Sequence, residues 1–249
     1  MKNNIANMPN EIDLDVEGLA STYPAGAHIE RHRHATHQVA HAVSGVLRVL
    51  ARDAAWIVPP GRALWIPAET EHEIRCGGPV EMRTVYIRGA RPAFPDRLQV
   101  IGVSPLLREI LVRFAEGCRP EQAAALTALL ATELADMRVQ PLSLPLPHDR
   151  NLARVSLALL QDPADQRSLQ DWARELGYAP RSLIRHIRSQ TGLTFRELRR
   201  QARVLAAIER LAGGAPVTTV AFDVGFSSPS AFTYAFRSVT GTTPRAYMR

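Results

Sequence analysis

Four side chains near the start of the sequence could bind a metal ion. They are His32, His34, Gln38 and His72. In an extended strand residues two apart face the same side, so the first three share one face, and His72 from another strand could join them. Imidazole nitrogens suit divalent transition metals, whereas glutamine adds a neutral oxygen, which binds a cation more weakly. The pattern predicts one divalent transition metal or a metal-free polar pocket, with simple hydrogen-bonded histidines as a third reading.

A second set of side chains, in the last seventy residues, could contact nucleic acid. Arginine can donate two hydrogen bonds to O6 and N7 of guanine, and hydroxyl groups can contact bases or phosphates. We expect DNA contacts from Arg181, Ser182, Arg185, His186, Arg188, Ser228, Ser230, Thr233, Tyr234 and Arg237.

The first of two helix-turn-helix units must position the arginines. Apolar residues at helical spacing form its first helix: Leu169, Trp172, Ala173 and Leu176. Gly177 and Tyr178 provide the turn, and Pro180 suits the first position of the next helix because its missing N–H has no partner to lose there. In that second helix Leu183, Ile184 and Ile187 are expected to point inward.

A second unit of the same plan follows about fifty residues later. Its first helix has an apolar face of Val217, Val220, Ala221 and Val224, and Gly225 suits the left-handed residue that ends such a helix. Its second helix is expected to bury Ala231, Phe232, Ala235 and Phe236. Between the units, Thr194 and Glu197 form a capping box that opens a helix to about Leu211. Two recognition helices on this frame would reach successive major-groove faces roughly 34 Å apart.

Residues 151–249 resemble the DNA-binding domain of the AraC/XylS family of bacterial transcription regulators. The residues that carry the resemblance are Val220-Ala221, Gly225-Phe226-Ser227, Ser230-Ala231-Phe232, Phe236-Arg237, Gly241, Thr243-Pro244 and Tyr247. Two departures occur in the first unit. Ala179 stands where the family usually has a serine cap, and Ile187 where it usually has phenylalanine. Loss of a capping hydroxyl costs about 1 kcal/mol, so this helix is expected to be less firmly set.

The charge distribution favours the same interpretation. Residues 1–147 contain 15 Lys+Arg against 16 Asp+Glu, a net charge of −1, whereas residues 148–249 contain 15 against 8, a net charge of +7. The positive charge is confined to the segment that would meet phosphate.

Short apolar runs separated by Gly and Pro breaks, from about Leu19 to Arg88, predict a β-sandwich or barrel. Gly26, His32, His34, Gln38 and Gly45 have the spacing of the first cupin motif, with glutamine for the usual glutamate. Gly61, Pro67 and His72 resemble the second motif, with Glu69 at its middle glycine position and Cys76 at its asparagine. Residues 1–98 therefore resemble the cupin sensor of many AraC-type regulators. In metal-binding cupins three histidines and a carboxylate hold one ion.

Residues 99–147 are expected to form a helical connector. Apolar spacing predicts helices over 104–117 and 121–138, which could dimerise, as in the resembling family, or cover the barrel; we favour dimerisation. Pro141–Pro147 cannot continue a helix and predicts the linker to residues 148–249. The predicted fold class is therefore α+β and multidomain: a jelly-roll-type cupin β-barrel, a helical connector, and an all-α tandem helix-turn-helix domain.

These expectations describe a transcription regulator, an activator or a repressor, that is not an enzyme. Its partners would be double-stranded DNA, a small-molecule or metal effector, a second copy of the chain and RNA polymerase, with control of a nearby transporter or catabolic gene by analogy. No apolar stretch approaches the roughly 20 residues that span a bilayer, so a cytoplasmic protein without membrane contact is expected. The alternatives are a metal-dependent cupin enzyme, such as a dioxygenase or isomerase with a helical appendage, and a module that sequesters a small molecule. Neither explains the tandem units or the charge distribution.

Overall fold

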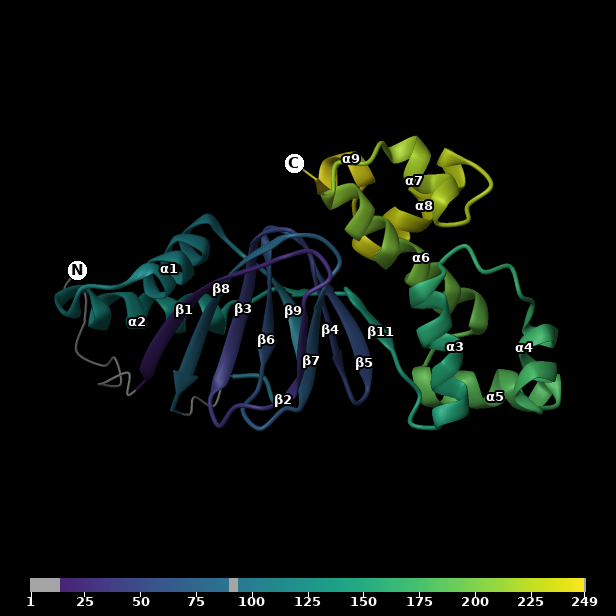
Figure 1. Cartoon of the computed structure of the whole chain (residues 1–249), viewed down its shortest axis with the longest axis horizontal. Coiled ribbons are helices and arrows are strands. Elements are labelled where there is room, and N and C mark those ends of the chain that lie inside the picture. Colours follow the sequence, from purple (N-terminus) through teal and green to yellow (C-terminus); the bar gives the residue numbers. More distant parts are fainter. Residues whose placement is uncertain (1–13, 90–93, 249) are drawn as a thin grey trace, which may run out of the picture.

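A computed structural model describes residues 14–89 and 94–248 of the chain. Figure 1 shows a β domain, a pair of helices beside one face of it, and a group of helices that ends the chain. The predicted fold class is confirmed in this form, an N-terminal β domain and a C-terminal helical domain. In the described residues no helix is both long and apolar enough to cross a membrane.

Two antiparallel sheets make up the β domain. Their first nine strands are β1 (Asp15–Tyr23), β2 (His28–His32), β3 (His37–Ser44), β4 (Leu47–Ala51), β5 (Ala54–Val58), β6 (Arg62–Ile66), β7 (His72–Cys76), β8 (Val80–Arg88) and β9 (Gln99–Gly102). One sheet has the order β1-β8-β3-β6-β9-β10 and the other β11-β5-β4-β7-β2. The strands of the described residues form two sheets that do not close into one barrel, so the cupin-like part is an open pair of facing sheets.

Alternation along the strands separates two apolar cores. In β3, Ala40 and Ala42 belong to the core that also contains Leu47 and Ile74 of the facing sheet. Val39 belongs instead to the core beneath helices α1 (Pro105–Glu116) and α2 (Pro120–Ala135). Since side chains alternate between faces, one strand serves both cores. The two predicted connector helices thus cover the outer face of the six-stranded sheet (Figure 1).

The segment between the helical pair and the C-terminal helices contains two short strands. They are β10 (Val139–Gln140), which pairs with β9, and β11 (Ser143–Pro145), which pairs with β5. The proline-rich run does not continue a helix, as expected, but its middle residues extend the five-stranded sheet. The chain therefore enters the C-terminal domain from the edge of this sheet.

In its described part, the C-terminal domain consists of seven helices. They are α3 (Arg150–Gln161), α4 (Leu169–Leu176), α5 (Pro180–Thr191), α6 (Phe195–Ala212), α7 (Val217–Asp223), α8 (Pro229–Thr240) and α9 (Pro244–Tyr247). Helices α4 and α5 make the first helix-turn-helix unit, α7 and α8 the second, and α6 joins them. Gly177 and Gly225 have φ values of 73° and 87°, the left-handed conformation expected at the two turns.

Candidate functional site

The β domain brings three of the predicted metal ligands together. Pairing of β2 with β7 sets His32 opposite His72, and His34 lies two residues beyond the end of β2. One ligand atom from each of the three histidines lies within 4.8 Å of the others. Their ring centroids are 4.4–5.7 Å apart. A cluster of this kind can supply three nitrogens to one ion.

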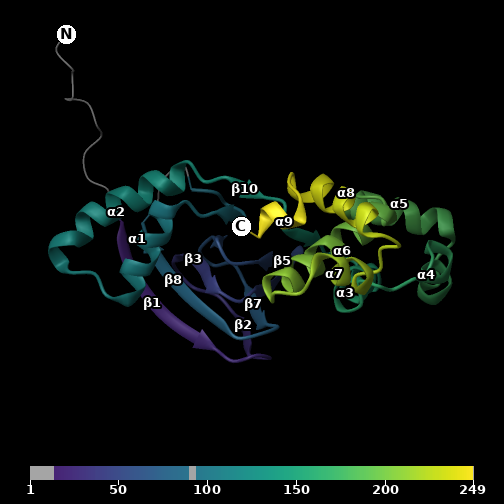
Figure 2. The same cartoon turned by 90° about the horizontal axis from the view of Figure 1, so that it is seen from above.

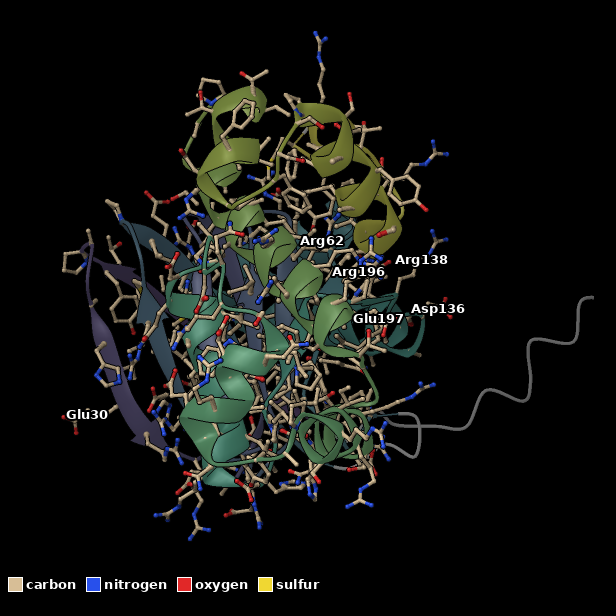
Figure 3. The ribbon with its side chains drawn as sticks, turned by 90° about the vertical axis from the view of Figure 1, so that its right-hand side faces the viewer. Glu30, Arg62, Asp136, Arg138, Arg196 and Glu197 are labelled. Carbon is tan, nitrogen blue, oxygen red and sulfur yellow. The ribbon has the colours of Figure 1, made fainter. Side chains whose placement is uncertain are left out.

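Backbone contacts fix the tautomers of two of these rings. His32 Nδ1 lies 2.7 Å from the carbonyl oxygen of Glu30, and His72 Nδ1 lies 2.9 Å from that of Thr70. Because a carbonyl oxygen only accepts, each Nδ1 must carry the proton and donate it, so Nε2 keeps its lone pair in the neutral ring. The Glu30 side chain itself points outward into solvent (Figure 3), so this residue acts through its backbone. Such carbonyl contacts are typical of metal-bound histidine.

Burial favours the neutral form of two of the three rings, His34 and His72. Desolvation lowers the pKa of His72 to about 4, with smaller contributions from the nearby His32 and His34. Desolvation, and then His32, also lowers the pKa of His34. Nε2 of His34 and of His72 is buried with no hydrogen-bond partner among the described residues. In His72, whose Nδ1 holds the ring proton, Nε2 is therefore an unpaired lone pair, the state in which imidazole binds a metal.

Gln38 lies on the inner face of β3, where its side chain is almost fully buried. It pairs with Tyr86 across β3 and β8, and its Oε1 has no hydrogen-bond partner among the described residues. Thr84, opposite Ala40 on the same face, likewise has an unpartnered Oγ1. The inner face thus holds unsatisfied polar atoms beyond the histidines. Sequence reasoning missed Thr84 and Tyr86, because only strand pairing relates them to Gln38.

His37 and His41 lie on the outer face of β3, away from the cluster, as their parity relative to Gln38 predicted. His32, His34 and Gln38 do not share one strand as expected, because β2 ends at His32 and β3 begins at His37 in the other sheet. His37 stacks on Trp65, and its Nδ1 accepts a hydrogen bond from the backbone N–H of Ala68. His41 Nδ1 donates to the carbonyl oxygen of Arg62. Both contacts belong to the outer face of the six-stranded sheet, so neither ring joins the cluster.

Glu69 explains how the chain adapts the second cupin motif. It has a φ of 60°, and it is the one non-glycine residue with a positive φ among the described residues. It stands at the position where the motif has glycine, the residue that adopts this conformation without strain. Its N–H donates to the carbonyl oxygen of His34 at 2.7 Å. The strained turn therefore holds the His34 backbone in place.

The predicted DNA-contacting side chains lie on and beside α5 and α8. The arginines of this set are exposed, as are Ser230 and Tyr234, the last at 76%. Ser182, His186 and Thr233 are half-buried, and Ser228 caps α8 by accepting from the N–H of Ala231. Seen from above, α5 and α8 lie toward the same side of the C-terminal domain (Figure 2).

Two apolar residues of these helices do not point inward as predicted. In α5, Leu183 and Ile187 are buried, but Ile184 is 51% exposed. In α8, Ala231 is also exposed. Ile184 follows Leu183 by about 100° around the helix, which is enough to leave the buried stripe. The outward face of α5 therefore carries an isoleucine between Arg181 and Arg185.

The exposed arginines of α5 and α8 have no acidic partner among the described residues. Arg181, Arg185, Arg188 and Arg237 form none of the ion pairs found there. The acidic neighbours that could have neutralised Arg185 are engaged elsewhere. Glu175 pairs with Arg154 and Arg167, and Asp171 caps α4 through Ser168 and contacts Arg174. The guanidinium groups of Arg181, Arg185, Arg188 and Arg237 are thus available to bind phosphate or bases.

The two domains make direct polar contacts. Arg48 of β4 donates two hydrogen bonds to Glu209 of α6, at 3.1 and 2.6 Å. Gln201 of α6 donates to the carbonyl oxygen of Ser143 in β11. At the other end of the interface the Arg62 guanidinium, labelled in Figure 3, lies 5.2 Å from the centroid of the Tyr247 ring. Helix α6, which spaces the two units, is thereby anchored to the β domain.

Comparison with known proteins assigns both parts of the chain. A family model for the AraC-like ligand binding domain matches residues 13–136, and a helix-turn-helix domain model matches residues 172–249. The HTH-type transcriptional regulator NimR of Escherichia coli (strain K12) is 29% identical over 221 residues, which are 87% of this chain and 81% of NimR. The HTH-type transcriptional regulator RipA of Corynebacterium glutamicum is 40% identical over 103 residues, 41% of this chain and 31% of RipA.

Two solved structures are also similar. ToxT from Vibrio cholerae O395 aligns with 94% of this chain and 96% of its own, at 13% identity and a TM-score of 0.42. The DNA-binding domain of AdpA, solved in complex with a target DNA, aligns with 39% of this chain and 89% of its own, at 32% identity and a TM-score of 0.37.

Proposed function

We propose, given that this chain belongs to the AraC family of DNA-binding transcription regulators, that its ligand-binding domain senses one divalent transition-metal ion. The observation that carries the proposal is the cluster of His32, His34 and His72, whose ligand atoms lie within 4.8 Å of one another. The fixed tautomers and buried, unpartnered Nε2 atoms support it further. Without an ion or ligand, such buried polar atoms would remain unsatisfied at a cost of about 1–3 kcal/mol each.

The donor set favours an ion that accepts imidazole. His32, His34 and His72 would hold it, and Gln38 is assigned the fourth, weaker contact through its neutral Oε1. When bound, the ion supplies a positive charge that ties β2 to β7. A metal-free ligand pocket built from the same polar atoms is the second candidate, favoured by the unpartnered Oγ1 of Thr84. The relatives to which the chain is similar are named as transcription regulators, which gives no support to the enzyme alternative. We therefore propose no catalytic role.

For DNA recognition, we assign base contacts to the outward face of α5 and both base and phosphate contacts to α8. Arg181 and Arg185 lie one turn apart on α5 and have no acidic partner among the described residues, which suits bidentate contacts to guanine. Arg237, in the last turn of α8, suits a phosphate contact. Ser182, His186, Arg188, Ser228, Ser230, Thr233 and Tyr234 complete the proposed interface.

Coupling between the ion and DNA would pass through the domain interface. The ion would tie strands of the five-stranded sheet, and α6 packs against β11 and β5 of that sheet and pairs with Arg48. If ion binding favours one placement of α6, it also favours one placement of α5 and α8.

We propose domains at 1–98, 99–147 and 148–249, with the regulator acting in the cytoplasm.

Assembly with further partners is part of the proposal. Leu106 of α1 and Leu129 of α2 are 47% and 43% exposed, which supports a homodimer through this helical pair. Contact with RNA polymerase is proposed from family membership alone.

Metal analysis of the purified chain tests the ion. We expect about one zinc, nickel, cobalt or iron per chain, removal by a chelator, and an increased free energy of unfolding when the ion is restored. His34→Ala should abolish this increase, whereas His37→Ala, a histidine outside the cluster, should keep it. If none of the four ions stabilises the metal-free protein, the proposal of an ion site is rejected. The histidine cluster would then be assigned to a metal-free ligand pocket.

A further inference from the structure

A cavity of about 930 Å³ lies between the β domain and the end of α6. The β domain contributes three turns, at Gly26–His28, Ser44–Val46 and Cys76–Pro79, together with Arg48 and Arg75. The C-terminal domain contributes Glu209, Arg210, Ala212 and Gly213. The volume lies within the range of small-molecule sites, and domain interfaces are a common place for them. A molecule in this cavity would touch both domains at once.

Small residues keep the cavity open. A Cβ added to Gly26, Gly77 or Gly78 would meet no heavy atom within 4 Å, so these positions face free space. Gly45 differs, because its added Cβ would lie 2.2 Å from the carbonyl oxygen of Pro79, which shows that two of the turns are tightly packed. Two of the turns thus pack against each other, while the three other glycines leave room beside them.

The charges that line the cavity favour an anion. Three arginines and one glutamate line the cavity. Both carboxylate oxygens of the glutamate, Glu209, already accept hydrogen bonds from Arg48. Arg75 pairs with Glu73 at the exposed rim. Arg210 forms no ion pair with a described residue, and its Nη1 is buried without a hydrogen-bond partner among them. A guanidinium in this condition gains most from an oxyanion, which it can bind with two parallel hydrogen bonds.

We propose that this cavity binds a small organic oxyanion, a carboxylate or a phosphate ester with an uncharged body. Its head group is assigned to Arg210, and its body to the glycine-, alanine- and proline-lined turns. Because the ligand would touch both domains beside the Arg48–Glu209 pair, it would stabilise the domain arrangement in which that pair is formed. This ligand site is separate from the histidine cluster, and its existence does not depend on metal binding.

Thermal unfolding of the full chain, kept metal-free with a chelator, tests the site at constant ionic strength. The probes are 4-phenylbutyrate, phenyl phosphate and the uncharged 4-phenylbutanamide. We expect at least one of the two anions to raise the melting temperature by about 3 °C at tenfold excess over its Kd, and the amide to have no effect. The responding anion identifies the head group as carboxylate or phosphate.

Two variants locate the binding. Arg210→Gln removes the cationic partner, and Gly78→Trp fills the cavity at a position with open space and no left-handed backbone. Both should lose the shift, whereas Arg174→Gln, on the exposed face of α4, should keep it. The proposal is overturned if neither anion shifts the wild-type chain, if the amide acts equally, or if either variant retains the full shift. Because no metal is present, failure here leaves the proposed metal site untouched.

Discussion

Arg48 in β4 and Glu209 in α6, 161 residues apart in the sequence, form a two-pronged ion pair across the domain interface. About a quarter of each side chain is exposed, so solvent screens the pair only in part. The pair joins the sheet that carries His32 and His72 to the helix that spaces the recognition helices. It is therefore the contact through which we expect the two domains to influence each other.

Arg48→Gln should lower the free energy of unfolding by about 1–3 kcal/mol, because the carboxylate of Glu209 loses two charged hydrogen bonds. In a double-mutant cycle with Glu209→Gln the two changes should be non-additive by more than about 0.5 kcal/mol. Arg75→Gln serves as the control, since its partner Glu73 lies two residues away on the same strand at the exposed rim. The free energy of unfolding is measured by urea denaturation. Additive effects of the two changes would mean that the Arg48–Glu209 pair contributes no interaction energy between the domains.

Arg185→Ala should weaken operator binding by about 1–3 kcal/mol and relax the preference at one or two base pairs. Arg237→Ala should weaken binding by a similar factor on all sequences and reduce the slope of log K against log salt by about one. A randomised-site binding profile and a salt titration separate the two roles. An Arg185→Ala chain with an unchanged profile and a lowered melting temperature would assign Arg185 to stability instead.

Ile184, exposed between two arginines, should contact the methyl group of a thymine. Ile184→Ala should then reduce the preference for thymine at one operator position, with little loss of stability because the side chain is half exposed already. Replacing that thymine by deoxyuracil should weaken binding of the wild-type chain but not of the variant. Equal sensitivity of both chains to deoxyuracil at every position would exclude the contact.

The acid stability of the chain should depend on His41. Burial, together with Arg108 and Arg83, lowers the pKa of this histidine, although its hydrogen bond to the Arg62 carbonyl acts the other way. The unfolded chain therefore binds a proton at higher pH than the folded chain. Stability contributed by the neutral ring is complete above the unfolded pKa of about 6.5 and is lost as the pH falls below it.

His41→Gln should consequently narrow the difference in unfolding free energy between pH 7.5 and pH 5.5, measured in metal-free protein. The comparison uses the difference, because the substitution also changes packing at both pH values. His148→Gln, at an exposed histidine, is the matched control. A difference as large in His41→Gln as in the wild-type chain would place the acid sensitivity elsewhere.

Local patterns predicted the elements of the C-terminal domain well because their causes are local. The capping box of Thr194 and Glu197 and the left-handed Gly177 and Gly225 are present as expected. Ala179 indeed gives α5 no side-chain cap. The exposure of Ile184 was not predicted, because an apolar residue next to the buried stripe of a helix looks from the sequence like part of that stripe. Whether it is buried depends on the neighbouring helices, which the sequence of α5 does not contain.

In the β domain, the period of two correctly placed Gln38 on the face of β3 opposite to His37 and His41. The expectation that His32, His34 and Gln38 lie on one strand was wrong, because β2 ends at His32 and β3 begins at His37 in the other sheet. Pairing between distant strands was beyond this reasoning. It determines that His72 lies opposite His32, that β11 forms within a proline-rich run, and that the two sheets remain open. The interface between Arg48 and Glu209 was equally hidden, because charged residues so far apart give no local signal.

The operator affinity of the metal-free chain, compared with that of the same chain loaded with its preferred ion, tests the central claim most directly. Fluorescence anisotropy should show at least a fivefold difference, in either direction, corresponding to about 1 kcal/mol of coupling. His72→Gln should bind DNA with one affinity under both conditions, and His37→Gln should respond like the wild-type chain. Identical affinities of the loaded and metal-free wild-type chain would contradict the claim that an ion in the histidine cluster regulates DNA binding.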